Sequence, residues 1–388
     1  MQAQLAAMAR EWSRDLTEWR RHLHANPEVS FQEYETTEWI ARRMEEWGIP
    51  YTRPTPTGLV GMIEGRRPGK TIAVRADIDA LPIAEENDFP FASTRPGAMH
   101  ACGHDGHTAI LLGLSRFFSQ NREFAGRIKL LFQPAEELPP GGAKAFVEAG
   151  VLDDVDACIG LHLISEVPTG GASICDGPMM ANSDGFSAKI YGRGGHGASP
   201  HQTVDAVMVA CNAVMNLQTI VSRKVDPTKP AVITVGSIHA GTTFNVIADS
   251  AEIKGTVRSF HSEVRQQLHD EIKRTLENTC AIYGATVELA YNWGYPALVN
   301  DAGIADVLRA AAQETLGEGN LSVQRPIMGG EDFAYYSQKV PAAFLFLGCR
   351  NPEVGANWEH HHPRFTIDEA ALPLGMEILG RATLRLLD

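Results

Sequence analysis

The sequence predicts an α/β protein that has a central mixed sheet flanked by helices and carries a smaller α+β domain as an insertion. Three observations support this fold class. Short apolar strands alternate with helical segments over residues 1–183, and the alternation returns over residues 295–388. Between them, residues 184–294 follow the order strand, helix, strand, strand, helix, strand. That order is typical of a ferredoxin-like sandwich, so we expect two domains with these boundaries.

Composition excludes several classes of protein. With 388 residues, 44% of them hydrophobic and 21% charged, the chain is long enough for two domains with buried cores. The net charge of -13 and the lack of a Lys/Arg run argue against nucleic-acid binding. The six cysteines are scattered, and we find neither a signal-peptide pattern nor an apolar run of membrane-spanning length. We therefore expect a cytoplasmic protein that does not bind membranes.

Two helices are predicted near the N-terminus. Apolar side chains recur at helical spacing over residues 4–24, and the Asn-Pro-Glu sequence at 26–28 ends this segment. We expect this helix to lie at the surface with its apolar side against the core. A second helix is predicted over residues 34–47, closed by Gly48.

Strands are predicted at residues 59–63 and 71–76, and the second runs directly into Asp77 and Asp79. In α/β sheets, ligands bind at the carboxyl ends of the strands, so these two carboxylates are candidate site residues. The alternative is that both are loop acids that cap the next element.

Residues 100–107 are the densest group of possible metal ligands in the chain. They read His-Ala-Cys-Gly-His-Asp-Gly-His, and their small residues allow the backbone to turn tightly so that side chains can converge. An apolar run follows at once and predicts a buried helix. Thiol and imidazole groups at the start of a helix suit a divalent metal such as Zn or Mn. A local hydrogen-bonded turn is the alternative.

Two further strands end in possible ligands. The strand at 128–132 is followed by Glu136 and Glu137, and the strand at 157–162 ends in His162. Adjacent acids in irregular backbone can point to different sides, so one could bind metal while the other faces substrate. Surface glutamate pairs are common, and a lone strand-end histidine is more often structural than a ligand. The interpretation of His162 as a ligand is strengthened because this is the third predicted strand that ends in a possible ligand.

The rest of the chain completes the two domains. In the insertion we expect strands at 186–191, 231–239, 250–259 and 286–292, and helices at 205–221 and 263–283. In the returning first domain we expect a helix at 304–316, a glycine loop at 328–333, a strand at 343–348, histidines at 360–362 and a helix at 368–386.

The candidate ligands come from separate segments, which indicates a folded site rather than a zinc finger. They are Cys102, His104, Glu137, His162 and one of the histidines at 360–362. Five ligands exceed the four of a structural zinc site and suit two metals with open positions for water and substrate. Glu136 fits the role of general base. Neither a nucleophile elbow nor a phosphate-binding loop is present, so the chemistry points to hydrolysis by a metal-activated water.

The chain resembles the M20 family of metal-dependent amidohydrolases and peptidases, most of all the hippurate hydrolases, N-acyl-L-amino-acid amidohydrolases and plant auxin-conjugate hydrolases. The matching segments span nearly the whole chain in the family's order; they are RRHLHANPEVSFQEYET, VRADIDALPI, HACGHDGHTA, PAEE, GLH, GRGGHGASPH, MGGEDFAYY and HHPRFTIDE. The resemblance implies a catalytic domain with an inserted lid and dimerisation domain. It also implies two divalent ions per subunit (Mn, Zn, Ni or Co) and a homodimer or dimer of dimers.

The resemblance also implies roles for individual residues. The metal ligands would be Cys102, His104, Glu137, His162 and His361, the catalytic residues Glu136 and Asp79, and the substrate-binding residues His196, Asn245 and Arg258. His361 is selected because the family's ligand histidine stands two residues before a proline. In the family the lid histidine comes from the neighbouring subunit. One departure is the sequence Leu-Ile-Ser-Glu-Val-Pro after His162, where relatives often have Trp or Pro; it bears on the acyl pocket.

The function implied is hydrolysis of the amide bond of a small N-acyl-L-amino acid, to a carboxylic acid and a free amino acid. The same site would also suit an N-acetyl-metabolite deacetylase or a small-peptide hydrolase. A non-catalytic metal-binding protein is a different alternative. The presence of Glu136 beside the ligands argues against it, because a binding protein needs no base.

Overall fold

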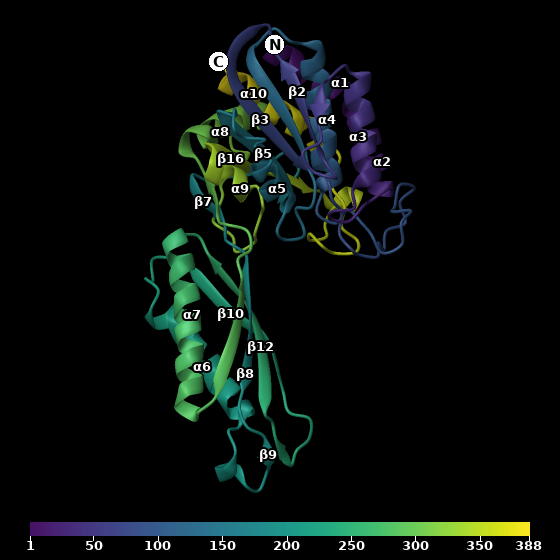
Figure 1. The fold of residues 1–388 in the computed structure, drawn as a ribbon. Helices are drawn as coiled ribbons and strands as arrows, with labels where there is room; N and C mark the ends of the chain where they lie inside the picture. The colour runs from purple at the N-terminus through teal and green to yellow at the C-terminus, as the bar shows by residue number, and fades with distance from the viewer. The chain divides into compact units, whose positions relative to one another are not determined.

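The computed structural model describes residues 1–388, which form two compact units (Figure 1). The first unit comprises Met1–Gly177, Val299–Arg325 and Asp332–Asp388, and the second comprises Pro178–Leu298 and Pro326–Glu331. The second unit thus extends slightly beyond the predicted insertion at both ends. It also takes in a short segment beside the glycine loop, which sequence periodicity did not indicate.

The first unit is built on a mixed sheet of eight strands. Their order is β1 (Tyr51–Thr52), β2 (Leu59–Glu64), β4 (Ala125–Gln133), β3 (Arg67–Asp77), β5 (Ala157–Pro168), β16 (Ala342–Arg350), β6 (Ala172–Ile174) and β15 (Leu321–Val323). The central strands β4, β3, β5 and β16 are parallel, whereas β2 and β6 join them antiparallel. The predicted fold class, an α/β protein with a central mixed sheet, is confirmed.

Helices flank this sheet. They are α1 (Gln2–Glu11), α2 (Ser13–Ala25), α3 (Tyr34–Glu46), α4 (His104–Gln120), α5 (Gly142–Glu148), α8 (Ala302–Leu316), α9 (Ala334–Lys339) and α10 (Ala371–Leu387). The prediction of one helix over residues 4–24 was wrong, because the helix breaks at Trp12, where ψ is 10°. The Trp12 indole is buried there, with the Arg116 guanidinium 4.3 Å from its ring centre.

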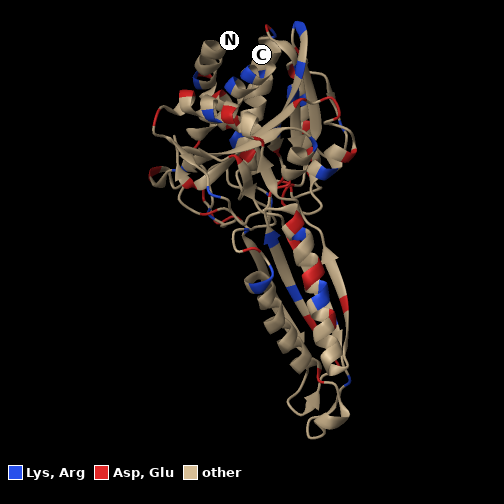
Figure 2. Cartoon of the chain, turned by 90° about the vertical axis from the view of Figure 1, so that its left-hand side faces the viewer, with Lys and Arg blue, Asp and Glu red and all other residues tan.

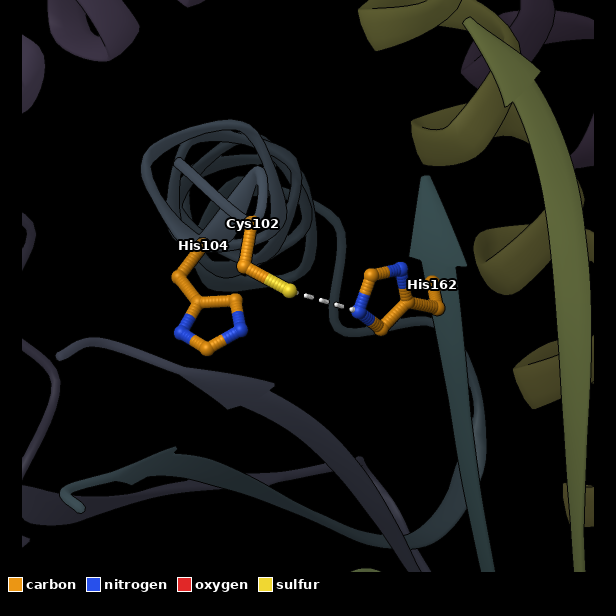
Figure 3. Close-up of side chains that lie close together, drawn as sticks. All are labelled: Cys102, His104 and His162. Carbon is orange, nitrogen blue, oxygen red and sulfur yellow. Dashed lines mark hydrogen bonds between the residues drawn. The ribbon is translucent and has the colours of Figure 1, made fainter. Parts of the chain in front are cut away.

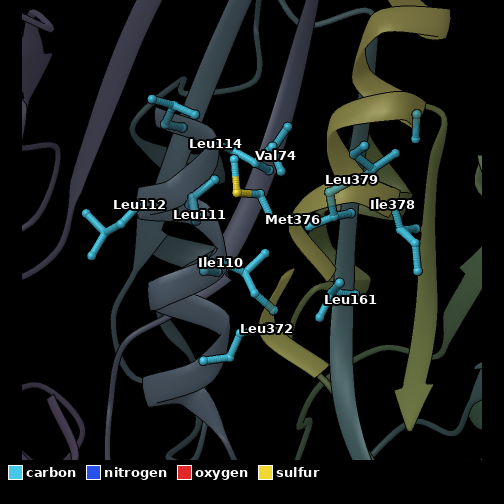
Figure 4. Packing of buried hydrophobic residues seen from close by; sticks show 14 of the residues in the cluster. Val74, Ile110, Leu111, Leu112, Leu114, Leu161, Leu372, Met376, Ile378 and Leu379 are labelled. Carbon is cyan, nitrogen blue, oxygen red and sulfur yellow. The ribbon is translucent and has the colours of Figure 1, made fainter. Parts of the chain in front are cut away.

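The core of the first unit packs α4 and α10 against β3 and β5 (Figure 4). Ile110 of α4 and Met376 of α10 lie among the labelled side chains, together with Val74 and Leu161 of the sheet. The two helices approach closely at Gly375, where a Cβ atom would lie 2.5 Å from Cδ1 of Ile110. Helix α4 is therefore held firmly, and so is the segment that begins it.

The second unit has its own antiparallel sheet and its own core. The sheet order is β10 (Ala231–Ala240), β12 (Ser250–Ser259), β8 (Asp184–Tyr191) and β13 (Thr286–Asn292). Helices α6 (Ala206–Arg223) and α7 (Ser262–Tyr283) pack on it, which gives the predicted order β-α-β-β-α-β. A ribbon of β9 (Gly195–His196) and β11 (Val246–Ile247) was not predicted. The short strands β7 (Gly177–Met180) and β14 (Leu298–Asn300) lie at the ends of the insertion. The hydrophobic cluster of this unit shares no residue with that of the first.

The two helices of the second unit differ in surface chemistry. Acidic and basic side chains alternate along α7, whereas α6 carries almost no charge (Figure 2). Its outward face exposes apolar or weakly polar side chains: Val207, Met208, Cys211 and Met215. None of the helices in the chain combines the length and hydrophobicity that crossing a lipid bilayer requires.

Candidate metal centre and active site

Three neighbouring strands bring the candidate carboxylates and His162 to one region of the sheet. Strands β4, β3 and β5 are parallel, and Asp77 at the end of β3 pairs with Gln133 at the end of β4. The acids that follow these strands therefore emerge at the same edge. The prediction that β5 ends at His162 was wrong, because β5 continues to Pro168 by pairing with β16. His162 nevertheless faces the ligand segment from within the strand.

The segment 100–107 meets His162 at the start of α4. Gly103, with φ of 92°, precedes the helix, and a Cβ atom on Gly106 would lie 2.6 Å from Cδ1 of Leu163. Glycine at these two positions lets the segment turn and lie directly on β5. Sγ of Cys102 is then 3.4 Å from Nε2 of His162, with the His104 ring on the other side of the thiol (Figure 3).

The hydrogen bonds of His104 and His162 leave one ring nitrogen of each suited to a metal. Nδ1 of His104 donates to the backbone carbonyl of Asp79 at 2.9 Å, and Nδ1 of His162 donates to that of Leu163 at 2.7 Å. In this tautomer each Nε2 carries a lone pair. Nε2 of His104 is buried and makes no hydrogen bond, which is unusual for a polar atom inside a protein. These residues fit a metal ion.

A second group of possible ligands shares Cys102 with the first. Cys102, His104 and His162 form one group, and Cys102, Glu137 and His361 form the other, with ligand atoms within 4.8 Å of one another in each. Oε1 of Glu137 lies 3.3 Å from Nε2 of His361. The structure thus brings together all five predicted ligands in two overlapping groups, an arrangement that suits a two-metal centre.

The three histidines at 360–362 have different surroundings. His360 is engaged at both nitrogens, at 3.0 Å from Oγ of Ser165 and 2.9 Å from the carbonyl of Leu163. His362 stacks on Trp358, with ring centres 4.2 Å apart. Only the imidazole of His361 belongs to a ligand group, which agrees with its selection from the sequence. Its φ of 65° marks backbone strain at the site.

His107 belongs to the ligand segment but has no nitrogen to offer a metal. Its Nδ1 donates to Oδ1 of Asp77 at 2.6 Å, and its Nε2 accepts from the backbone N–H of Leu163 at 2.9 Å. His107 therefore ties α4 to β3 and β5. Asp77, noted in the sequence as a candidate site residue, supports this contact rather than a metal.

The electrostatics of the cluster favour a bound cation. Burial, and then the charges of Glu137 and Glu136, raise the pKa of the Cys102 thiol well above its ordinary value. Burial lowers the pKa of His162 well below its ordinary value, so this ring stays neutral. A thiolate can persist here only if a positive charge compensates it, and a metal ion supplies that charge.

Glu136 and Asp79, the two predicted catalytic residues, have different environments. Glu136 is buried beside the ligands, and its Oε2 is 4.0 Å from Nε2 of His104. Asp79 is surrounded by protein groups: its Oδ2 accepts from the Ser30 hydroxyl at 2.7 Å and from the backbone N–H of Glu137 at 3.0 Å. These contacts support a positioning role for Asp79 rather than contact with substrate.

The three predicted substrate-binding residues lie in the second unit. His196 is exposed on β9 and pairs with Val246 of β11, so it lies beside the exposed Asn245. Arg258 is half-buried near the other end of β12, where its guanidinium donates to the carbonyl of Asp184 at 3.2 Å. The structure therefore brings His196 and Asn245 together but keeps Arg258 apart from them.

Cys102→Ala is expected to reduce the bound metal by at least one ion per chain, because Cys102 is the residue that both ligand groups share. Metal content after dialysis, measured by mass spectrometry, tests this expectation.

The matched control is Cys158→Ala, which removes a fully buried thiol from β5 outside the ligand groups. It should keep the wild-type metal content even if it lowers thermal stability. Two metals per chain in Cys102→Ala would show that the thiol is not a ligand.

Comparisons with known proteins show similarity to one family over most of the chain. The family model described as Peptidase family M20/M25/M40 matches residues 73–385. An N-acyl-L-amino acid amidohydrolase of Geobacillus stearothermophilus is 49% identical over 288 residues, which cover 74% of this chain and 78% of that protein. An N-acetyl-L-cysteine deacetylase of Bacillus subtilis (strain 168) is 44% identical over 374 residues, covering 95% of this chain and 87% of that protein.

A solved structure that is described as metal-binding supports the fold. The crystal structure of the Bacillus subtilis YXEP protein, described as a dinuclear metal-binding peptidase of the M20 family, superposes with a TM-score of 0.85. It is 37% identical in sequence, and the match covers 97% of this chain and 99% of that one.

Proposed function

Because the chain belongs to peptidase family M20/M25/M40, and is therefore an enzyme of the amidohydrolase and peptidase class, we propose that it hydrolyses N-acyl-L-amino acids. Hippurate-like substrates would yield a carboxylic acid and a free amino acid. The observation that carries the proposal is the buried cluster in which Cys102 belongs to two ligand groups and Glu136 lies beside His104.

The donor set supports two divalent ions per subunit. Thiolate, imidazole and carboxylate ligands suit Mn, Zn, Ni or Co. When bound, such ions supply Lewis-acid activation of a water molecule and of the acyl oxygen. The residues that would hold them are Cys102, His104, Glu137, His162 and His361.

Glu136 is proposed as the general base. Its carboxylate would accept a proton from the attacking water and later give it to the nitrogen of the leaving amine, as the carbon–nitrogen bond breaks. Its burial supports this role, because a carboxylate shielded from bulk water can keep the proton until the amine needs it. Asp79 would hold the backbone of Glu137 and the ring of His104 in place.

Arg258, Asn245 and His196 are proposed to bind the substrate. Arg258 would pair with the carboxylate of the amino acid, since a guanidinium can bind a carboxylate through two parallel hydrogen bonds. Asn245 would bind the substrate carbonyl, and His196 would donate to the oxyanion that develops at the acyl oxygen. The half-burial of Arg258 supports its role, because a partly desolvated guanidinium binds anions more strongly than an exposed one.

The spacing of these residues supports a homodimer in which each subunit completes the site of the other. Ser250 at one end of β12 pairs with Tyr191, after which the chain enters the β9 ribbon, whereas Arg258 lies eight positions along the strand. That separation is about 26 Å at ~3.3 Å per residue, too far for Arg258 and His196 of one chain to touch one small substrate. The uncharged outward face of α6 supports a dimer, since exposed apolar surface often marks an interface (Figure 2).

Deacetylation of an N-acetylated metabolite is the second candidate activity. One relative is described as an N-acetyl-L-cysteine deacetylase and is 44% identical to this chain. The two activities use the same chemistry and differ in the size of the acyl group, so only substrate preference separates them. A small-peptide hydrolase would differ in the same way.

A substrate panel tests the proposed function. The metal-free protein, reloaded separately with Mn, Zn, Ni or Co, is assayed on hippurate, N-acetyl-amino acids and dipeptides. We expect the highest kcat/KM on an N-acyl-L-amino acid, and poor activity on the same compound with its carboxylate amidated, because Arg258 would lose its partner. A clear preference for dipeptides, or for amides that lack a carboxylate, would contradict the proposal.

A further inference from the structure

The residues before α3 contact the loop that follows β3. Residues 28–33 precede the part of the chain that the family model matches, which begins at residue 73. Ser30 donates a hydrogen bond from Oγ to Oδ2 of Asp79 at 2.7 Å, and Ala80 donates its N–H to the carbonyl of Glu28 at 2.8 Å. This segment therefore helps to hold the loop that carries Asp79.

Glu33 makes the corresponding contact to the loop that follows β4. Its side chain is 0% exposed, and its Oε1 accepts a hydrogen bond from the backbone N–H of Ala135 at 2.8 Å. Ala135 directly precedes Glu136 and has a φ of 54°, in the left-handed region that residues other than glycine rarely adopt. The contact is therefore made at a strained position of the backbone.

A buried carboxyl group at position 33 is unfavourable unless it has a specific use. Burial, and then the charge of Asp79, raise the pKa of Glu33 to about 7. Its Oε2 is buried without a well-formed hydrogen bond, although Thr57 is a polar neighbour of the carboxyl. An apolar side chain would fill the same space without these costs. An apolar side chain could not, however, accept the hydrogen bond from the backbone N–H of Ala135.

We propose that Glu33 is a positioning residue that maintains the strained turn at Ala135. In this way it directs the side chains of Glu136 and Glu137 toward different neighbouring residues. Oε2 of Glu136 lies 4.0 Å from Nε2 of His104, whereas Oε1 of Glu137 lies 3.3 Å from Nε2 of His361. Without the acceptor, Ala135 can relax to a negative φ, which rotates both carboxylates. The inference rests on the proposed function, in which Glu136 is the base and Glu137 a ligand.

Substitutions at positions 33 and 135 test the coupling. At saturating metal, Glu33→Leu is expected to lower kcat by roughly ten-fold or more, with a smaller change in KM. The reason is that moving a catalytic group by ~1 Å can lower the rate of the chemical step by about 10²-fold. Glu33→Gln keeps an acceptor oxygen and should stay close to the wild type. Adding Ala135→Gly to Glu33→Leu should restore part of the kcat, since glycine adopts positive φ without strain. A general loss of stability would not be repaired in this way.

Hydrogen exchange gives a readout that does not depend on activity. In the metal-free protein, the backbone amide of residue 135 should exchange faster in Glu33→Leu than in the wild type, and Glu33→Gln should not show this change. If Glu33→Leu does not fold, the same exchange measurement is made on Glu33→Ala, which also lacks the acceptor. Unchanged exchange at residue 135 would overturn the inference, whereas an active Glu136→Gln would overturn only the proposed function.

Glu28→Leu is the matched control from the same segment. The Glu28 carboxylate is also buried, but it accepts hydrogen bonds from the backbone N–H groups of Glu35 and Thr36 at the start of α3. Its loss should lower the melting temperature and leave kcat and the exchange at residue 135 unchanged. An equal effect of Glu28→Leu on kcat would mean that Glu33 acts through stability alone, which would overturn the inference.

Discussion

Glu136→Gln is expected to lower kcat by about 10²–10⁴-fold while the fold and the metal content remain, because an amide cannot accept the proton that a general base removes. Glutamine has nearly the size of glutamate, so the packing around this buried side chain should not change. The measurements are kcat on the best substrate, metal content by mass spectrometry, and thermal unfolding.

Glu137→Gln is the matched control, because it changes the neighbouring acid in the same way. Oε1 of Glu137 lies 3.3 Å from Nε2 of His361 in a ligand group, so this variant should lose metal. Excess metal should restore part of its activity, but should not restore Glu136→Gln. Near-normal turnover in Glu136→Gln would show that the base is another group.

Mixing Glu136→Gln with His196→Ala is expected to recover about a quarter of the wild-type activity from two nearly inactive proteins. If the proposed homodimer forms, random exchange puts half of the chains into heterodimers. One site of each heterodimer then combines an intact Glu136 with the intact His196 of the partner. Activity should rise with the fraction of heterodimer, which native mass spectrometry measures.

His201→Ala is the control for this experiment. His201 is exposed a few residues after His196, in the turn that follows β9, but it is not proposed to touch substrate. His201→Ala should be active alone, so its mixture with Glu136→Gln should show no gain beyond dilution. If subunits exchange and His196→Ala shows no recovery, then His196 acts within its own chain or has no catalytic role.

The candidate ligands could be picked out of the sequence because their signals are local. Thiol and imidazole groups are dense in residues 100–107, and the acids directly follow predicted strands. The same density did not distinguish His107 from His104. That difference arises from contacts of His107 with Asp77 and Leu163, which are distant in sequence. Glu33 was missed for the same reason, because its partner Ala135 lies 102 residues away.

The fold was predictable where periodicity extends over several turns or a whole strand. The long helices of both units and the strands of the second unit were found in this way. The three-residue strands β6 and β15 are too short to show a period. The break at Trp12 has no turn residue to mark it in the sequence. Tertiary packing decides such details.

The separation of the two hydrophobic clusters has a consequence for how this chain can change over evolutionary time. Since the clusters share no residue, a destabilising substitution in one cluster can be compensated by another substitution within the same unit. Its effect on the free energy of unfolding simply adds to the effects of substitutions in the other cluster. The proposed metal ligands and Glu136 lie in the first unit, whereas the proposed substrate-binding residues His196, Asn245 and Arg258 lie in the second. Under the proposed function, selection can therefore alter the residues that would hold the substrate without disturbing those that would break the bond.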